Sequence, residues 1–249
     1  MDINFNINSE LIGNTQFIKL CILDKNSKYI FNFITNNGDL LSNQWFDDVV
    51  IFQDGFAQVK LKGKWNFINT KGEYISDQWF DWVDNFQDGF AKVELDNKWN
   101  FLNSGGKIIS DDQWFDMAGW FYEGFSRVSL NDKWNLINKD GKLISGQWFD
   151  DIGEFKNGFA KVKLNSKYNY INTEGKLISD QWFDMVVDFI NDSFNVKLDG
   201  KGWNIINTDG KLISDQWFDG VGIRYNGLIE VLLNGKLCYI DTNGKLISK

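Results

Sequence analysis

The sequence predicts an all-β protein built from seven copies of one short repeat. The tetrapeptide Gln-Trp-Phe-Asp recurs six times at intervals of 34 or 35 residues, and the chain contains no proline. Between these tetrapeptides apolar and polar residues alternate with a period of two, which indicates strands with one buried side. A repeat this short cannot bury a core alone, so neighbouring copies must cover one another. The tetrapeptides start at Gln44, Gln78, Gln113, Gln147, Gln181 and Gln216.

A second hydrophobic block brings the number of copies to seven. The block reads Trp-Asn-Phe-Ile-Asn in its clearest form, and the first and last copies depart most from it. Because the period is unbroken, we expect a single repeat domain that spans residues 1–249. The equivalent positions are Phe31, Trp65, Trp99, Trp134, Tyr168, Trp203 and Leu237.

Each copy is expected to contain three or four short antiparallel strands. Residues 57–61 and 91–95 alternate between apolar and polar side chains, and the aromatic blocks at 65–68 and 168–171 suit a half-buried strand. The polar connections between them, such as Lys62-Gly63-Lys64, have the length of a hairpin turn. The aromatic block is followed by a tight turn of the type Asn-Thr-Lys-Gly, in which glycine accepts a positive φ. A short strand then leads into the next tetrapeptide.

Two arrangements of these β-meanders remain open. Residues 3–7 alternate like a strand that precedes the first copy, whereas the last copy ends without that strand. A ring would let the first segment complete the last copy and remove both exposed edges. This favours a propeller-like ring, and the alternative is an open β superhelix or solenoid.

Composition narrows the class of partner. The chain has 26 basic and 34 acidic residues and no cluster of Lys or Arg, so we expect it to bind neither nucleic acid nor an anionic membrane. No apolar run approaches the roughly 18 residues that span a bilayer, and no signal peptide is recognisable. A cytoplasmic location is the default expectation, and export by a non-classical route stays open.

The residues that usually carry catalysis are scarce. Histidine is absent, the two cysteines lie in the first and last copies, and no glycine-rich phosphate loop is present. The sequence therefore predicts no catalytic residue, no metal site and no cofactor, and it indicates that the protein is not an enzyme.

An aspartate follows every Trp-Phe pair. Identical geometry in six places favours a structural role, in which each carboxylate accepts hydrogen bonds from backbone amides at a strand bend. A glycosidase pair and a calcium site are the alternatives. These structural positions are Asp47, Asp81, Asp116, Asp150, Asp184 and Asp219.

The tryptophans of the tetrapeptide are expected to pack between copies, because a large aromatic ring buries much area. The alternative is a set of exposed platforms that stack on sugars. These positions are Trp45, Trp79, Trp114, Trp148, Trp182 and Trp217.

Residues that are unique on a repeated background are the best candidates for a specific site. Trp82 and Trp120 have no counterpart in the other copies. Together with their sequence neighbours they form the candidate ligand or partner patch, which consists of Trp82, Trp120, Phe121, Tyr122 and Arg127.

The repeat resembles the bacterial WG (Trp-Gly) repeat. The resemblance rests on Gly-Phe-Ala-x-Val, on Lys-Trp, on Phe-Ile-Asn-x-x-Gly and on the aromatic-Asp-Asp segment before a Phe-x-x-Gly, and it covers nearly the whole chain. It implies a β-rich repeat domain, often joined to other modules, with no common activity. In most copies asparagine replaces the glycine after the tryptophan, and since asparagine tolerates left-handed backbone, we hypothesise a positive φ there. These asparagines are Asn66, Asn100, Asn135, Asn169 and Asn204.

Two functions follow as candidates. The first is a non-catalytic binding module whose repeat-built surface recognises a protein partner. The second is a multivalent glycan-binding, lectin-like protein in which several weak sites act together. Burial of the repeated tryptophans would count against the second.

Overall fold

The computed structural model describes residues 17–110, 113–190 and 192–248. Within these ranges every regular element is a β-strand, and the strands form a series of small antiparallel sheets. The all-β prediction and the repeated meanders are thereby confirmed. No helix in the described part of the chain has the length and apolar character needed to cross a membrane.

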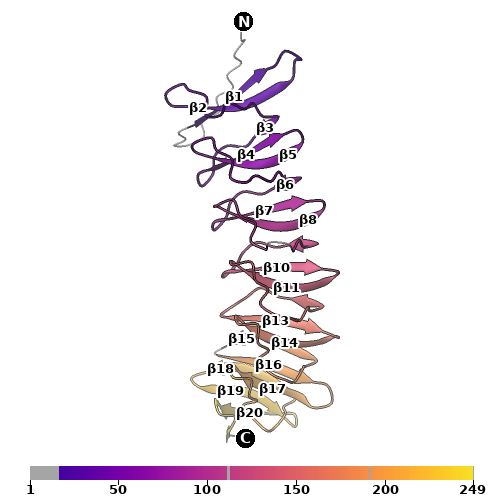
Figure 1. Ribbon diagram of the computed structural model, residues 1–249. Helices are drawn as coiled ribbons and strands as arrows, with labels where there is room; N and C mark the ends of the chain where they lie inside the picture. Colours follow the sequence, from indigo (N-terminus) through magenta and orange to yellow (C-terminus); the bar gives the residue numbers. More distant parts are fainter. Residues whose placement is uncertain (1–16, 111–112, 191, 249) are drawn as a thin grey trace. The chain divides into compact units, whose positions relative to one another are not determined.

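The chain divides into two compact units, the first of which ends at Ala118. In the first unit each three-stranded sheet consists of a two-residue strand followed by a hairpin, as Figure 1 shows for β3–β5 and β6–β8. Its strands are β1 (Phe17–Leu23), β2 (Tyr29–Thr35), β3 (Asp48–Val49), β4 (Phe56–Leu61), β5 (Lys64–Asn69), β6 (Trp82–Val83), β7 (Phe90–Leu95), β8 (Lys98–Asn103) and β9 (Met117–Ala118).

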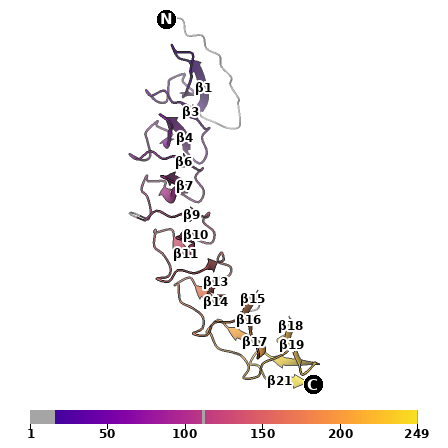
Figure 2. The ribbon, with the colours of Figure 1, turned by 90° about the vertical axis from the view of Figure 1, so that its right-hand side faces the viewer.

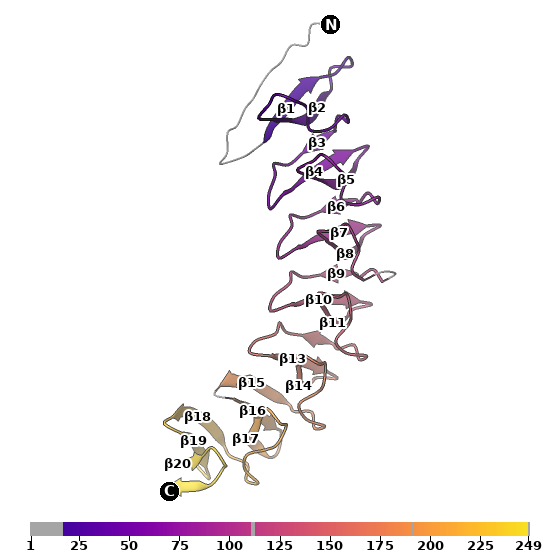
Figure 3. The same ribbon diagram turned by 60° about the vertical axis from the view of Figure 1, so that its left-hand side comes forward.

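The second unit begins at Gly119 and also consists of successive hairpins, but the first strand of each of its last two sheets has six residues and its last sheet has four strands. After the hairpin β10–β11 it contains the sheets β12–β13–β14, β15–β16–β17 and β18–β19–β20–β21, and the last two lie side by side in Figures 2 and 3. Its strands are β10 (Phe125–Leu130), β11 (Lys133–Asn138), β12 (Asp151–Ile152), β13 (Phe159–Leu164), β14 (Lys167–Asn172), β15 (Met185–Ile190), β16 (Ser193–Leu198), β17 (Gly202–Asn207), β18 (Gly220–Tyr225), β19 (Leu228–Leu233), β20 (Lys236–Asp241) and β21 (Leu246–Ser248).

The hairpins have the turns that the sequence predicts. β4 and β5 pair without interruption from Phe56↔Asn69 to Leu61↔Lys64. The two linking residues, Lys62 and Gly63, have φ values of 51° and 84°. Positive φ at both positions gives the twist that matches two adjacent strands, so the predicted hairpin turn is confirmed.

Consecutive sheets are joined through their backbones. Trp65 in β5 and Phe80 before β6 exchange two N–H···O bonds, of 2.7 and 2.9 Å. The tight turn after the aromatic block also approaches the preceding sheet, because a Cβ atom on Gly175 would lie only 1.6 Å from the carbonyl oxygen of Ile144. Glycine is therefore required in this turn both for its positive φ and for its close contact with the neighbouring sheet.

The tetrapeptide places its phenylalanine, rather than its tryptophan, at the centre of the core. The phenylalanines that follow the six tryptophans are almost completely buried, whereas each tryptophan is only half-buried. Trp79, Trp114, Trp182 and Trp217 pack at the margins of separate core clusters. The buried rings belong to Phe46, Phe80, Phe115, Phe149, Phe183 and Phe218.

The hypothesis of left-handed backbone at the repeated asparagines is wrong. These residues lie inside strands and none of them has a positive φ. The side chain of Asn66 is completely buried, and its Nδ2 donates to the carbonyl oxygens of Ser76 (2.7 Å) and Gln78 (3.2 Å). Its Oδ1 accepts a hydrogen bond from the backbone N–H of Phe67. The buried asparagine side chain therefore uses hydrogen bonds to hold the loop that leads into the next tetrapeptide.

The arrangement of all seven copies stays a prediction from the sequence, as does the single domain over residues 1–249. The segment 3–7, which favours the ring, lies outside the described residues.

Candidate functional site

A pair of phenylalanine rings in tilted contact recurs between consecutive sheets. The first residue of one hairpin contacts the phenylalanine that precedes the next hairpin, with ring centroids 4.3 Å apart for Phe56 and Phe86 and 4.4 Å apart for Phe125 and Phe155. Because these rings fill the gap between two sheets, they exclude water from it. The same contact joins Phe17 to Phe52 in the first unit.

Both members of this pair are replaced between the last two sheets. Ser193 pairs with Asn207 at the start of its hairpin, as Phe125 pairs with Asn138 in an earlier copy, so it stands in the place of that phenylalanine. Arg224 opens the segment Arg-Tyr-Asn-Gly, which aligns with the segment Phe-Lys-Asn-Gly that begins at Phe155. A serine and an arginine therefore occupy a position that two aromatic rings fill elsewhere.

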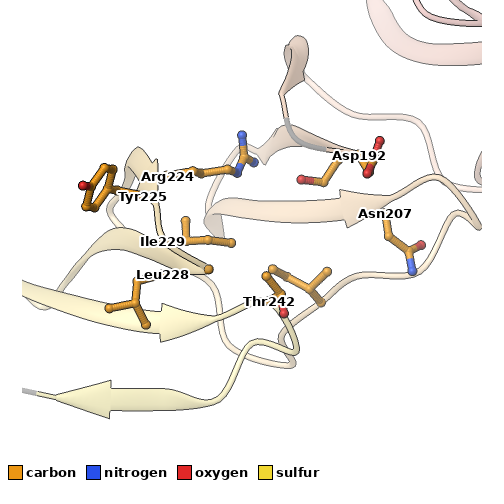
Figure 4. A pocket seen from close by; sticks show the side chains of 10 residues that line it. Asp192, Asn207, Arg224, Tyr225, Leu228, Ile229 and Thr242 are labelled. Atoms are coloured by element: carbon orange, nitrogen blue, oxygen red, sulfur yellow. The ribbon is translucent and has the colours of Figure 1, made fainter.

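The replacement leaves a cavity of about 400 Å³ between the sheets β15–β17 and β18–β21. Ile213, Leu228 and Ile229 supply its apolar wall. Figure 4 shows the Arg224 side chain extending from β18 toward Asp192, while the Tyr225 ring points the other way. The complete lining consists of Asp192, Ser193, Asn207, Ile213, Arg224, Tyr225, Gly227, Leu228, Ile229 and Thr242.

The guanidinium of Arg224 is the most unusual polar group of this cavity. Its Nη2 donates to Oδ1 of Asn195 at 2.5 Å, but Nε and Nη1 are buried without a hydrogen-bond acceptor among the described residues. Burial also lowers the pKa of Arg224, because a charged group is less stable away from water. The cavity therefore offers unused N–H donors beside an apolar wall.

Sequence reasoning missed Arg224, although a signal was present. Phe52, Phe86 and Phe155 stand at the same position of their copies, and a charged residue in this series marks a departure from core packing.

The residues proposed as a patch divide between the two units. Trp82 belongs to the first unit, where it lies in β6 with its ring half-exposed and 5.4 Å from that of Trp99. In the second unit Trp120 and Tyr122 are 40% and 53% exposed. Phe121 lies between them and is only 8% exposed, because it stands at the repeated core position of Phe155. Phe121 therefore belongs to the core, and its place in the predicted patch is corrected.

Arg127 is held by its own neighbours. Its Nη2 lies 3.0 Å from Oδ1 of Asp151, and its guanidinium carbon lies 4.6 Å from the centre of the Trp134 ring. The charge of Arg127 is therefore compensated, in contrast to that of Arg224, although Nε of Arg127 is also buried without an acceptor among the described residues.

The repeated aspartates join one sheet to the next. Lys64, at the start of β5, donates to Oδ1 of Asp81, while Oδ2 of the same carboxylate accepts the backbone N–H of Asp96 at 2.9 Å. The lysine hydrogen bond is the main reason why the pKa of Asp81 lies below its usual value. The same lysine contact exists at Asp47, Asp116, Asp150 and Asp184.

Asp219 lacks this lysine partner, because Gly202 stands at the start of β17 where Lys167 starts β14. Its Oδ2 accepts the backbone N–H of Gly235 at 2.8 Å. Within the described ranges no cluster of three acidic, cysteine or histidine side chains has the geometry to hold a metal ion.

The last sheet also exposes an apolar face. On β19 and β20, Leu232 pairs with Leu237 and Glu230 pairs with Tyr239, and since paired residues share a face, all four point the same way. Ile229, Val231, Cys238 and Ile240 fill the opposite, buried face. The exposed large side chains of this sheet are Ile223, Tyr225, Leu228, Leu232, Leu237, Tyr239 and Ile247.

Comparisons with known proteins support the repeat. The model of the family described as "WG containing repeat" matches residues 46–65, 67–99, 115–134 and 136–168. These four segments together make up less than half of the chain. No curated protein matches the sequence.

Two solved structures illustrate how distant the structural matches are. Hsv2 from Kluyveromyces lactis is 11% identical over 92% of this chain and 87% of its own, with a TM-score of 0.34. A protein of unknown function from Bacteroides caccae is 13% identical over 88% of each chain, with a TM-score of 0.23. Scores this low do not indicate a shared overall fold.

Proposed function

We propose that this protein is a non-catalytic binding module that recognises a protein partner through the outer face of its last sheet. The observation that carries the proposal is the exposed apolar face of β19 and β20, which contains Leu228, Leu232, Leu237 and Tyr239. Soluble proteins rarely expose contiguous apolar surface of this kind without a binding role.

The inner sheets indicate what covers such a face. Tyr239 stands opposite Glu230 in its hairpin, as Phe67 stands opposite Gln58 in an earlier one. Phe67 is buried because the Phe86 ring of the next sheet lies 4.8 Å away. A partner segment that lies on the last sheet as a further β layer would supply an aromatic ring in the same way.

Charge adds a second requirement for the partner. Glu230 lies at the centre of the exposed face and is half-buried. A carboxylate at the centre of an apolar interface needs an opposite charge, because otherwise its desolvation opposes binding. The partner is therefore a protein segment that presents an aromatic and a basic side chain together.

A catalytic role and a glycan-binding role have less support. The repeated aspartates bind lysines and turn amides, which leaves them ionised and occupied rather than poised to transfer protons. The repeated tryptophans are half-buried and pack on core clusters, so their faces are poor platforms for sugars.

The test uses site-specific photo-crosslinking followed by affinity measurement. A photoreactive residue at Tyr239 is compared with one at Tyr74, an exposed tyrosine of the first unit, in cells that produce the protein. The proposal predicts a partner crosslinked at Tyr239 only, which then binds the purified chain at least tenfold more weakly after Leu237→Asp and equally after Tyr74→Asp.

Three results would contradict it. These are equal crosslinking at both sites, unchanged affinity after Leu237→Asp, and self-association of the purified chain that Leu237→Asp abolishes. Binding on a glycan array that Trp182→Ala abolishes would support the lectin instead.

A further inference from the structure

We propose that the cavity around Arg224 is a binding site for a small organic carboxylate. The ligand would place its carboxylate against the guanidinium and its apolar substituent against Ile213, Leu228 and Ile229. Leu228 borders both this cavity and the outer face of β19 and β20, so the variants that distinguish the two proposals are placed elsewhere, at Arg224 and Ser193 for the cavity and at Leu237 for the face.

The unused donors are the first argument. Nε and Nη1 of Arg224 are buried, yet no described residue accepts a hydrogen bond from them. A buried donor without an acceptor destabilises the folded protein unless a ligand or water supplies one. A carboxylate has two oxygens that fit the planar donor fork of a guanidinium.

The contrast with Arg127 is the second argument. Arg127 has Asp151 as a carboxylate partner, whereas within 4 Å no carboxylate of the described residues meets Arg224. Asn195 holds Nη2 through a neutral amide oxygen and so orients the guanidinium without neutralising it. The positive charge remains available for an anion.

The local repeat background is the third argument. In earlier copies the equivalent space is filled by two aromatic rings in contact, as by Phe125 and Phe155. Ser193 and Arg224 remove this packing and leave about 400 Å³, which is in the range of small-ligand pockets. Packing alone would favour two phenylalanines at these positions, so the replacement indicates a use other than stability.

The lining also selects the type of anion. Asp192 lies at the cavity with its own negative charge, which disfavours ligands with two or more negative charges. A single carboxylate is therefore preferred over phosphate. The same group is offered by a free aliphatic acid and by the C-terminus of a peptide that ends in an apolar residue.

Calorimetric titration of the full purified chain tests the proposal. The probes are 4-methylpentanoate, its neutral amide, a tripeptide ending in leucine with a free or an amidated C-terminus, and inorganic phosphate. We expect at least one of the two carboxylates to bind, and its amide and phosphate to bind at least tenfold more weakly. Binding of the acid but not of the peptide identifies the free acid as the ligand type, and the reverse identifies a C-terminus.

Variants connect the binding to the cavity. Arg224→Met keeps an unbranched apolar stem and removes the donors, and Ser193→Phe restores the residue that earlier copies have. Each should weaken carboxylate binding at least tenfold, whereas Lys142→Met, an exposed control in the same unit, should not. Thermal melting confirms that each variant is folded, and either variant alone suffices if the other fails to fold.

The proposal is overturned if neither carboxylate binds at millimolar concentration or if acid and amide bind equally. It is also overturned if phosphate matches the carboxylates, or if a folded Arg224→Met or Ser193→Phe variant binds as well as the unmodified chain.

Discussion

Nη2 of Arg224 donates a hydrogen bond to Oδ1 of Asn195 at 2.5 Å, and this bond links the last sheet to the sheet before it. In earlier copies the corresponding link between sheets includes a pair of phenylalanine rings. Between the last two sheets, a polar contact and a cavity therefore occupy the space that apolar rings fill in earlier copies. The predictions below follow from this difference and from the repeated contacts around it.

Removing a ring from an intact phenylalanine pair should be costly. Phe155 is almost completely buried, so Phe155→Ala should lower the free energy of unfolding by about 3–5 kcal/mol, as urea denaturation would measure. Arg224→Met, at the same position of its copy, should cause a smaller loss, because it removes the hydrogen bond to Asn195 but also removes two buried donors that have no acceptor among the described residues. Equal losses at both positions would contradict our interpretation of the cavity.

The tetrapeptide should depend more on its phenylalanine than on its tryptophan. Phe183 is 1% exposed, and Phe183→Ala should cost about 3–5 kcal/mol of unfolding free energy. Trp182 is half-buried at the margin of its cluster, so Trp182→Ala should cost less, about 1–3 kcal/mol. Chemical denaturation of the two variants side by side would decide the order, and a larger loss at Trp182 would show that our ranking is wrong.

The buried asparagine should act through its amide. Asn169 donates to the carbonyl oxygens of Ser179 and Gln181, and Asn169→Ala leaves both without this donor. We expect a loss of about 1–3 kcal/mol in unfolding free energy. Gln181→Ala is the matched control, because it keeps the backbone carbonyl that accepts the hydrogen bond. Hydrogen exchange of the loop at 179–182 should accelerate in the first variant only.

Two adjacent aromatic residues should behave differently. Trp120→Ala should change the unfolding free energy by no more than about 1 kcal/mol, because its ring is 40% exposed. Phe121→Ala should cost about 3–5 kcal/mol, because that ring is in the core. Thermal and urea denaturation would check both. If Trp120→Ala lowers the unfolding free energy as much as Phe121→Ala does, Trp120 has a structural role and does not belong to a surface patch.

Acid should weaken the protein through the repeated aspartates. The lysine hydrogen bonds hold the pKa of Asp81, Asp150 and Asp184 below the ordinary value, so the folded state binds fewer protons than the unfolded state. Stability is therefore fully present above the unfolded pKa of about 3.9 and is lost as pH falls through the folded values. The double variant Asp150→Asn/Asp184→Asn should show a shallower fall of stability between about pH 4 and pH 2. An unchanged slope would contradict these pairings.

Much of the fold follows from local sequence. The alternation in residues 57–61 and the turn at Lys62-Gly63 specify a hairpin through contacts between near neighbours, and the structure confirms it. The resemblance to WG repeats also found support, in four segments of the chain.

The candidate site was harder to predict. Phe121 looked like part of a unique aromatic run, but alignment with Phe155 places it at a core position, and its burial follows. Asn66 was expected to replace glycine in left-handed backbone. Instead its side-chain amide donates to carbonyl oxygens that lie 10 and 12 residues away in the sequence. Such partners cannot be identified from the residue type.

The period, the strands and the turns can be recognised in the amino-acid sequence, because they depend on side-chain alternation and on glycine within a few residues. That phenylalanine fills the core while tryptophan borders it, and that Ser193 and Arg224 meet at one cavity, became known from the folded structure. These outcomes depend on which faces of consecutive sheets come into contact, and residues about 30 positions apart meet only after the sheets have stacked.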